Sequence, residues 1–71
     1  MDEDLKKNPL WALLVETAHA LPLYRSHKAY IKTTILNEMP KILPEELSRR
    51  LGMPLGEAIV ILDELTNDRL V

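Results

Sequence analysis

Five prolines divide this chain into segments, and their positions constrain its fold more than any other feature. Pro9 follows a capping asparagine and predicts a helix start, because the first helical position leaves the N–H without a hydrogen bond in any case. Pro22 and Pro40 predict helix ends, since a proline inside a helix removes a hydrogen bond and clashes with the preceding turn. Pro44 opens a further helix that Gly52 closes. The chain is therefore predicted to consist of short helices joined by tight turns.

The spacing of the apolar residues predicts four helices in a single domain. They cover residues 9 to 21, 26 to 39, 44 to 51 and 56 to 68. Residues 41 to 43 are predicted to be extended, residues 69 to 71 to begin a strand, and residues 1 to 7 to be flexible. A chain of 71 residues can bury only one core, so we expect one domain over residues 1 to 71. Its core positions are predicted to be Ile31, Ile35, Leu36, Met39, Leu47, Leu51, Ala58, Ile61, Leu62 and Leu65.

The first predicted helix carries an apolar arc over more than half of its circumference. The arc consists of Leu10, Trp11, Leu13, Leu14, Val15, Ala18 and Leu21, which leaves Ala12, Glu16 and His19 for water. So wide an arc has two explanations, and the sequence leaves both open. Either the rest of the chain packs against the helix from two sides, or a second subunit covers part of it. In the second case we expect a homodimer with an interface at Leu10, Trp11, Leu14, Val15, Ala18 and Leu21.

The composition is that of a globular protein without a membrane segment or a disulfide framework. Apolar residues make up 46% of the chain and charged residues 28%, and there is no cysteine. The longest apolar run, PLWALLV, is too short to span a bilayer. The start MDEDLKKN lacks the basic opening of a signal peptide. We therefore expect a cytoplasmic protein that does not enter a membrane.

No arrangement of side chains in the sequence predicts catalysis or metal binding. His19 and His27 lie on different predicted helices, with Glu16 three positions before the first, whereas a metal site needs three or four converging ligands. Glu45 and Glu46 are adjacent and point in different directions, so they cannot act as an acid–base pair. The segment GMPLG lacks the spacing and the lysine of a phosphate-binding loop. We expect a non-enzymatic protein with no cofactor and no metal.

Residues 35 to 71 resemble the winged-helix branch of the helix-turn-helix superfamily. The resemblance rests on the segments ILNEM, KIL, PEELSRRLGM and AIVILDELTNDRLV. It implies a first helix, a short strand, a positioning helix, a turn, a recognition helix and a strand that enters the wing. It also implies either DNA binding or protein docking, because domains of this superfamily serve both functions.

Two features depart from the winged-helix pattern. The chain ends at Val71, where the family continues into a second wing strand, so that at most Leu70 and Val71 could pair with residues 41 to 43. The helix within residues 8 to 22 is an addition to the minimal fold, and such extensions often form dimers. We therefore predict an all-α, four-helix domain of the winged-helix type with a minimal wing or none, whose helix-turn-helix core covers residues 26 to 71.

The predicted recognition helix has few groups suited to DNA. The positions that would enter the major groove are Pro54, Leu55, Gly56, Glu57, Ile59, Val60 and Asp63, and none is a cationic or amide donor. Acidic side chains against phosphates cost about 1 kcal/mol or more per close contact at an effective dielectric near 20. From Pro44 onward, six acidic residues stand against three basic ones. The part of the chain that resembles a DNA-binding module is therefore its acidic part.

These residues predict that the last helix docks on another protein. The expected docking face consists of Leu55, Ile59, Val60, Asp63, Glu64 and Asn67. Contiguous exposed apolar side chains tend to mark contact sites, although the N-terminal helix of the same chain could instead cover Ile59 and Val60. By analogy with the superfamily, such a module is expected in transcription or replication machinery.

DNA binding by a dimeric transcriptional regulator is the alternative function. A dimer could gather Arg25, Lys28, Lys32, Arg49 and Arg50 into one basic face that contacts phosphates. The formal net charge of −2 gives the chain no excess of positive charge. The lysines can also lay their alkyl stems over the edge of the core and keep their charges in water.

Overall fold

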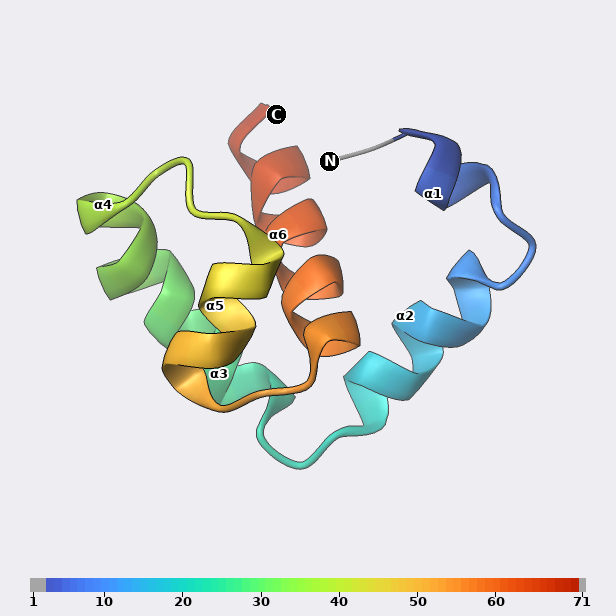
Figure 1. Cartoon of the computed structure of the whole chain (residues 1–71), viewed down its shortest axis with the longest axis horizontal. Helices are drawn as coiled ribbons and strands as arrows, with labels where there is room; N and C mark the ends of the chain where they lie inside the picture. Colours follow the sequence, from blue (N-terminus) through green and yellow to red (C-terminus); the bar gives the residue numbers. More distant parts are fainter. Residues whose placement is uncertain (1–2, 71) are drawn as a thin grey trace.

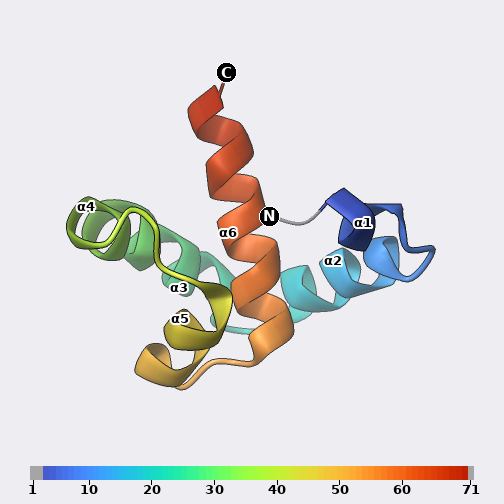
Figure 2. The same cartoon turned by 45° about the horizontal axis from the view of Figure 1, so that its top comes forward.

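The central element of the fold is the C-terminal helix, α6 (Leu55–Leu70), which the other helices surround (Figures 1 and 2). The structure is a computed structural model that describes the backbone of residues 3 to 70 and the side chains of residues 5 to 67. The elements before α6 are α1 (Glu3–Lys7), α2 (Trp11–Ala20), α3 (Tyr24–Tyr30), η1 (Ile31–Ile35), α4 (Leu36–Glu38) and α5 (Pro44–Leu51). Helices α1 and α2 lie on one side of α6, and α3 to α5 lie on the other. Residues 3 to 70 contain no strand, which confirms the all-α prediction.

The boundaries of α5 and α2 follow from local side chains. Helix α5 occupies the predicted residues 44 to 51, and Gly52 ends it with a left-handed φ of 65°. Helix α2 begins at Trp11, later than predicted, because Oδ1 of Asn8 accepts a hydrogen bond from the N–H of Leu10 at 2.8 Å. This bond closes a turn ahead of the helix instead of capping a helix that starts at Pro9.

The second predicted helix is continuous from Tyr24 to Glu38 and contains a π-helical turn, η1, in its middle. It begins at Tyr24 rather than at Ser26, with Leu23 in the N-cap position. A π turn holds an extra residue and shifts the faces of the helix that follow it. The predicted core residues Ile31, Ile35 and Leu36 are buried, and Met39 is half-buried against them.

The strand predicted at residues 69 to 71 is wrong for the part of the chain that the structure describes. Arg69 and Leu70 continue α6, and Val71 lies outside the described residues. Leu43 has extended dihedral angles, φ −86° and ψ 151°, but residues 41 to 43 pair with no strand within residues 3 to 70. Each further residue of a helix adds a hydrogen bond, whereas a strand needs a neighbour to satisfy its backbone.

The segment of residues 1 to 7 was expected to be flexible, and it contains the short helix α1. Nζ of Lys6 lies 2.7 Å from Oδ1 of Asp63 in α6. Leu5 also lies beside α6, where it lines a groove described below. These contacts explain the position of α1, because a helix of five residues has little stability of its own.

The core lies where α6 meets the helices on both of its sides. Ala18, Ile31 and Leu47 bring apolar side chains to it from α2, η1 and α5. The core positions predicted on α6 are confirmed, because Ala58, Ile61, Leu62 and Leu65 are all buried, and Leu51 of α5 packs half-buried against them. A helix with buried residues on almost every side is typical of the centre of a domain rather than of its surface.

Gly52→Ala is expected to lower the free energy of unfolding by about 1 kcal/mol. Its φ of 65° lies in the left-handed region, and a Cβ atom there would meet no atom within 4 Å, so the cost comes from the backbone alone. Urea denaturation of both proteins measures the difference. Gly52→Asn should lose less, since asparagine tolerates the left-handed region better than alanine. Equal losses for the two variants would contradict this explanation.

Candidate docking surface

Two acidic side chains of α6 are buried and paired within the chain. Glu57 is 2% exposed, and its Oε2 lies 2.8 Å from Nδ1 of His27 in α3. Asp63 is 6% exposed, and its Oδ1 lies 2.7 Å from Nζ of Lys6 in α1. A buried carboxylate without a partner is strongly disfavoured, so each of these pairs binds a neighbouring helix to α6.

A third acidic side chain, Glu64, joins three helices. Its Oε2 lies 2.6 Å from Nε2 of His19 in α2. Its Oε1 accepts hydrogen bonds from the hydroxyl group of Tyr24 and, at 3.1 Å, from Nζ of Lys28, both in α3. The rings of His19 and Tyr24 have centroids 4.8 Å apart, and Nζ of Lys28 lies 5.9 Å from the centroid of the Tyr24 ring. Glu64 therefore serves as a shared acceptor inside the fold.

The docking face expected on α6 is only partly exposed. Val60 has no exposed surface and Asp63 is buried, so the expectation that these two face a partner is wrong. The physical reason is that neighbouring helices pack around α6 and supply partners for its acidic side chains. Glu64 is engaged in the same way, whereas Ile59 is half-buried, and Leu55 and Asn67 are exposed. Asn67 donates from Nδ2 to Oδ2 of Asp63 at 3.5 Å.

Helix α2 uses most of its apolar arc inside its own chain. Ala18 is buried, and Trp11, Leu14, Val15 and Leu21 are half-buried against the core. The helices approach closely at Gly56 of α6, where a Cβ atom would lie 2.7 Å from Cδ1 of Leu14. Packing within the chain therefore explains five of the six residues expected at a dimer interface. The homodimer remains a prediction that now depends on Leu10 and Leu13, which are 64% and 57% exposed.

Two of the five basic residues that were expected to contact DNA in the alternative function form ion pairs within the chain. Lys28 pairs with Glu64, and NH2 of Arg50 lies 3.1 Å from Oε2 of Glu46. The other three, Arg25, Lys32 and Arg49, are exposed.

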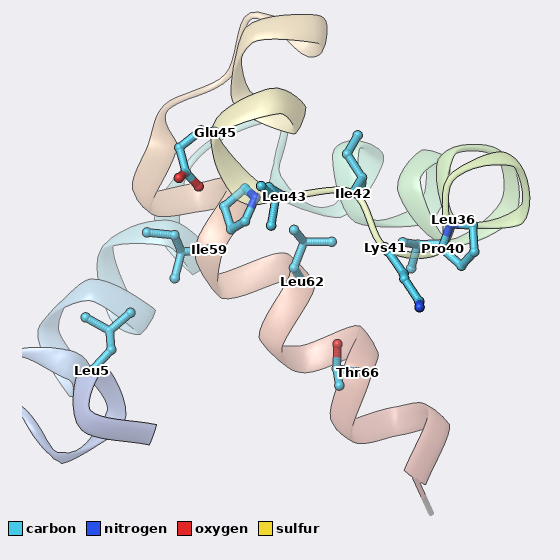
Figure 3. A pocket seen from close by; sticks show the side chains of 11 residues that line it. Leu5, Leu36, Pro40, Lys41, Ile42, Leu43, Glu45, Ile59, Leu62 and Thr66 are labelled. Carbon is cyan, nitrogen blue, oxygen red and sulfur yellow. The ribbon is translucent and has the colours of Figure 1, made fainter. Parts of the chain in front are cut away.

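A groove of about 480 Å³ lies beside α6 at a place that the sequence did not indicate as a unit (Figure 3). Helix α6 supplies Ile59, Leu62 and Thr66 to it, at positions i, i+3 and i+7 of one helical stripe. The segment from Pro40 to Glu45 forms the other wall, and Leu5 and Leu36 complete the lining. Two charged side chains, Lys41 and Glu45, lie at opposite ends of the groove (Figure 3).

Leu43 places an exposed apolar side chain in the groove wall. It is 63% exposed and occupies the N-cap of α5, where no side chain makes a capping hydrogen bond. Serine, threonine, aspartate or asparagine at this position would satisfy an N–H group of the first helical turn. Leu10 and Leu23 are also exposed leucines at N-caps without a capping hydrogen bond, so Leu43 differs from them by its place in the wall of the groove beside α6. The groove with Leu43 in its wall is therefore the candidate docking surface.

Among the groove residues, the sequence indicated Ile59 as part of a docking face but did not indicate Leu43, Lys41 or Leu5. One feature of the sequence could have pointed to Leu43: the residue directly before Pro44 is a leucine and not one of the usual capping residues. The approach of Leu5 to Ile59 could not have been found in this way, since it depends on how α1 packs against α6.

Leu43→Asp is expected to raise the free energy of unfolding by about 1 kcal/mol. The aspartate can accept a hydrogen bond from the first turn of α5 and interacts favourably with the positive end of that helix. Little packing is lost, because Leu43 is 63% exposed. Urea denaturation measures the gain, and Leu43→Ala, which lacks an acceptor, should show none. A loss of stability with aspartate would mean that Leu43 contributes to the core.

Other kinds of site find no support in the part of the chain that the structure describes. Among those residues, no group of three or more histidine, aspartate or glutamate side chains could hold a metal ion. No helix there is long and apolar enough to cross a membrane. No protein-family model matches the chain, and no curated protein or solved structure is significantly similar to it.

Proposed function

We propose that this chain is a non-enzymatic interaction module that binds another protein through the groove beside α6. The observation that carries the proposal is Leu43, an apolar side chain 63% exposed at a helix N-cap and directed to an apolar groove. Exposed apolar surface with a charged rim is typical of protein contact sites. A place in transcription or replication machinery follows only from the resemblance to the helix-turn-helix superfamily.

The burial of α6 supports docking against the one stripe of this helix that lines the groove, rather than insertion of the whole helix into a partner. Between residues 55 and 67, seven side chains are buried: Glu57, Ala58, Val60, Ile61, Leu62, Asp63 and Leu65. A helix that reads a major groove needs an exposed face of polar side chains. The acidic charge of α6 is no longer an argument against DNA, since Glu57, Asp63 and Glu64 all have partners inside the fold.

The proposal can be tested with two matched variants of the whole chain. Leu43→Asp and Leu23→Asp each place a carboxylate at an N-cap leucine, and these leucines are 63% and 58% exposed. Only Leu43 lines the groove. A partner is first identified by cross-linking in extract of the native cells and then purified for surface plasmon resonance.

We expect the wild-type chain and Leu23→Asp to bind the purified partner equally. Leu43→Asp should weaken binding roughly tenfold or more, because a carboxylate replaces an apolar contact in the wall of the groove. A partner that binds all three proteins with the same affinity would contradict docking in the groove.

Duplex DNA is not expected to bind this chain. Fluorescence anisotropy at low salt should show no binding to random duplex below about 10⁻⁴ M. The reason is the net charge of −2, together with the pairing of Lys28 and Arg50 inside the chain. Tight binding that falls steeply with salt, and is lost when Arg25, Lys32 and Arg49 are replaced by alanine, would favour the alternative function instead.

A further inference from the structure

We infer that the partner segment in the groove is a short amphipathic helix that lies antiparallel to α6, with its acidic first turn at Lys41 and its basic last turn at Glu45. This inference rests on the proposed function and specifies the partner for the same groove. Three features of the groove lead to it: the spacing of its floor, its size and the charges at its ends.

The floor of the groove has the spacing of a helix–helix contact. Ile59, Leu62 and Thr66 form a stripe at steps of three and four residues, which spans about 10 Å at the helical rise. Rows of this kind interlock with the equivalent rows of a second helix. The other sides of α6 already pack against helices (Figures 1 and 2). A further helix in the groove would continue that arrangement.

The size of the groove suits a helix of two to three turns. Its floor spans about 10 Å, which is the length of two helical turns. Helices that bind in grooves usually insert apolar side chains at positions i, i+3 or i+4, and i+7. Leu5 and Leu43 flank the floor from opposite sides and can contact such side chains (Figure 3).

The charges at the ends of the groove select the direction of the helix. Glu45 lies toward Ile59, and Lys41 lies toward Leu62 and Thr66 (Figure 3). Among the side chains that the structure describes, the ion pairs involve neither Lys41 nor Glu45. A helix is most stable with acidic residues in its first turn and basic residues in its last. Such a helix is complementary to the groove only when it runs opposite to α6.

The test uses the full chain and two fluorescein-labelled peptides of about 11 residues, the length of three helical turns, each held helical by a side-chain cross-link. Both peptides carry leucine at positions i, i+4 and i+7. The first has glutamate in its first turn and lysine in its last turn, and the second has these charges exchanged. The cross-link keeps the helix content equal, so that a difference in affinity reports the charges of the groove.

Fluorescence anisotropy is expected to show that the wild-type chain binds the first peptide about tenfold more tightly than the second. The reason is that two attractive contacts at the groove ends become two repulsive ones. The double variant Lys41→Glu/Glu45→Lys keeps the net charge and should reverse the preference. Leu43→Asp should weaken the binding of both peptides.

Several results would overturn the inference. Equal binding of the two peptides would do so, as would failure of both to bind, or tighter binding of a proline-containing extended peptide with the same leucines. These results leave the proposed function standing, because the comparison of Leu43→Asp with Leu23→Asp tests that function separately. A dimer of the chain itself, detected by light scattering and dissociated by Leu43→Asp, would place a second copy in the groove and overturn the inference as well.

Discussion

Val60→Asp is expected to remove much or all of the stability of the chain. Val60 has no exposed surface, and an aspartate there would be buried without a partner. Such a substitution costs about 4 kcal/mol or more. A domain of this size has a total stability of only about 4 to 10 kcal/mol. Urea denaturation followed by far-ultraviolet circular dichroism should therefore show either no folded state or a free energy of unfolding lower by at least about 4 kcal/mol.

Thr66→Asp is the matched control for this prediction. It places the same charge on an exposed position of the same helix and should change the free energy of unfolding by no more than about 0.5 kcal/mol. If Val60→Asp melts cooperatively near the wild-type temperature, then Val60 faces water. In that case the predicted docking face on α6 would be correct at Val60, and α6 would not lie at the centre of the fold.

His27→Ala is expected to lower the free energy of unfolding by about 3 kcal/mol. His27 is the hydrogen-bond partner of Glu57, whose side chain is 2% exposed and would remain in the core as an unpaired carboxylate. The His27 side chain is itself 21% exposed, so some water can reach the space that it vacates. The loss of free energy of unfolding is therefore expected at the lower end of the range for removing one partner of a buried pair. Urea denaturation measures the loss, and the dependence of the free energy of unfolding on urea concentration should be the same in both proteins.

Two further variants separate the pair from other effects of His27. His27→Asn keeps a donor close to the position of Nδ1 and should lose only about 1 kcal/mol. The double variant His27→Leu/Glu57→Leu removes both polar groups and should be close to the wild type, because apolar residues often replace a buried ion pair without loss. A double variant as unstable as His27→Ala would show that the carboxylate is not the cause.

Helix α5 shows how much local sequence can determine. Pro44 at its start, Gly52 at its end and the inward position of Leu47 all agree with the structure. Each of these features acts over a few residues: proline lacks an N–H, glycine adopts a left-handed φ, and leucines four apart share a face. The same reasoning placed the start of α2 too early, because the side chain of Asn8 closes a turn of its own.

Helix α6 shows where local sequence fails. Acidic side chains at Glu57, Asp63 and Glu64 suggested a surface exposed to water or to a partner. Their actual partners come from distant parts of the chain, since His27 is 30 positions from Glu57 and His19 is 45 positions from Glu64. Periodicity cannot distinguish a charged side chain in water from one paired in the core, because the spacing along the helix is the same in both cases.

The sequence by itself determined the helical class, the main helix boundaries and most of the core, because these depend on backbone chemistry and on the spacing of apolar residues within each segment. Only the tertiary structure decided which faces remain exposed. It buried Val60 at the centre of the fold and left Leu43 beside an open groove. The physical reason is that burial depends on which segments pack together in space, and a single helix contains no information about its neighbours.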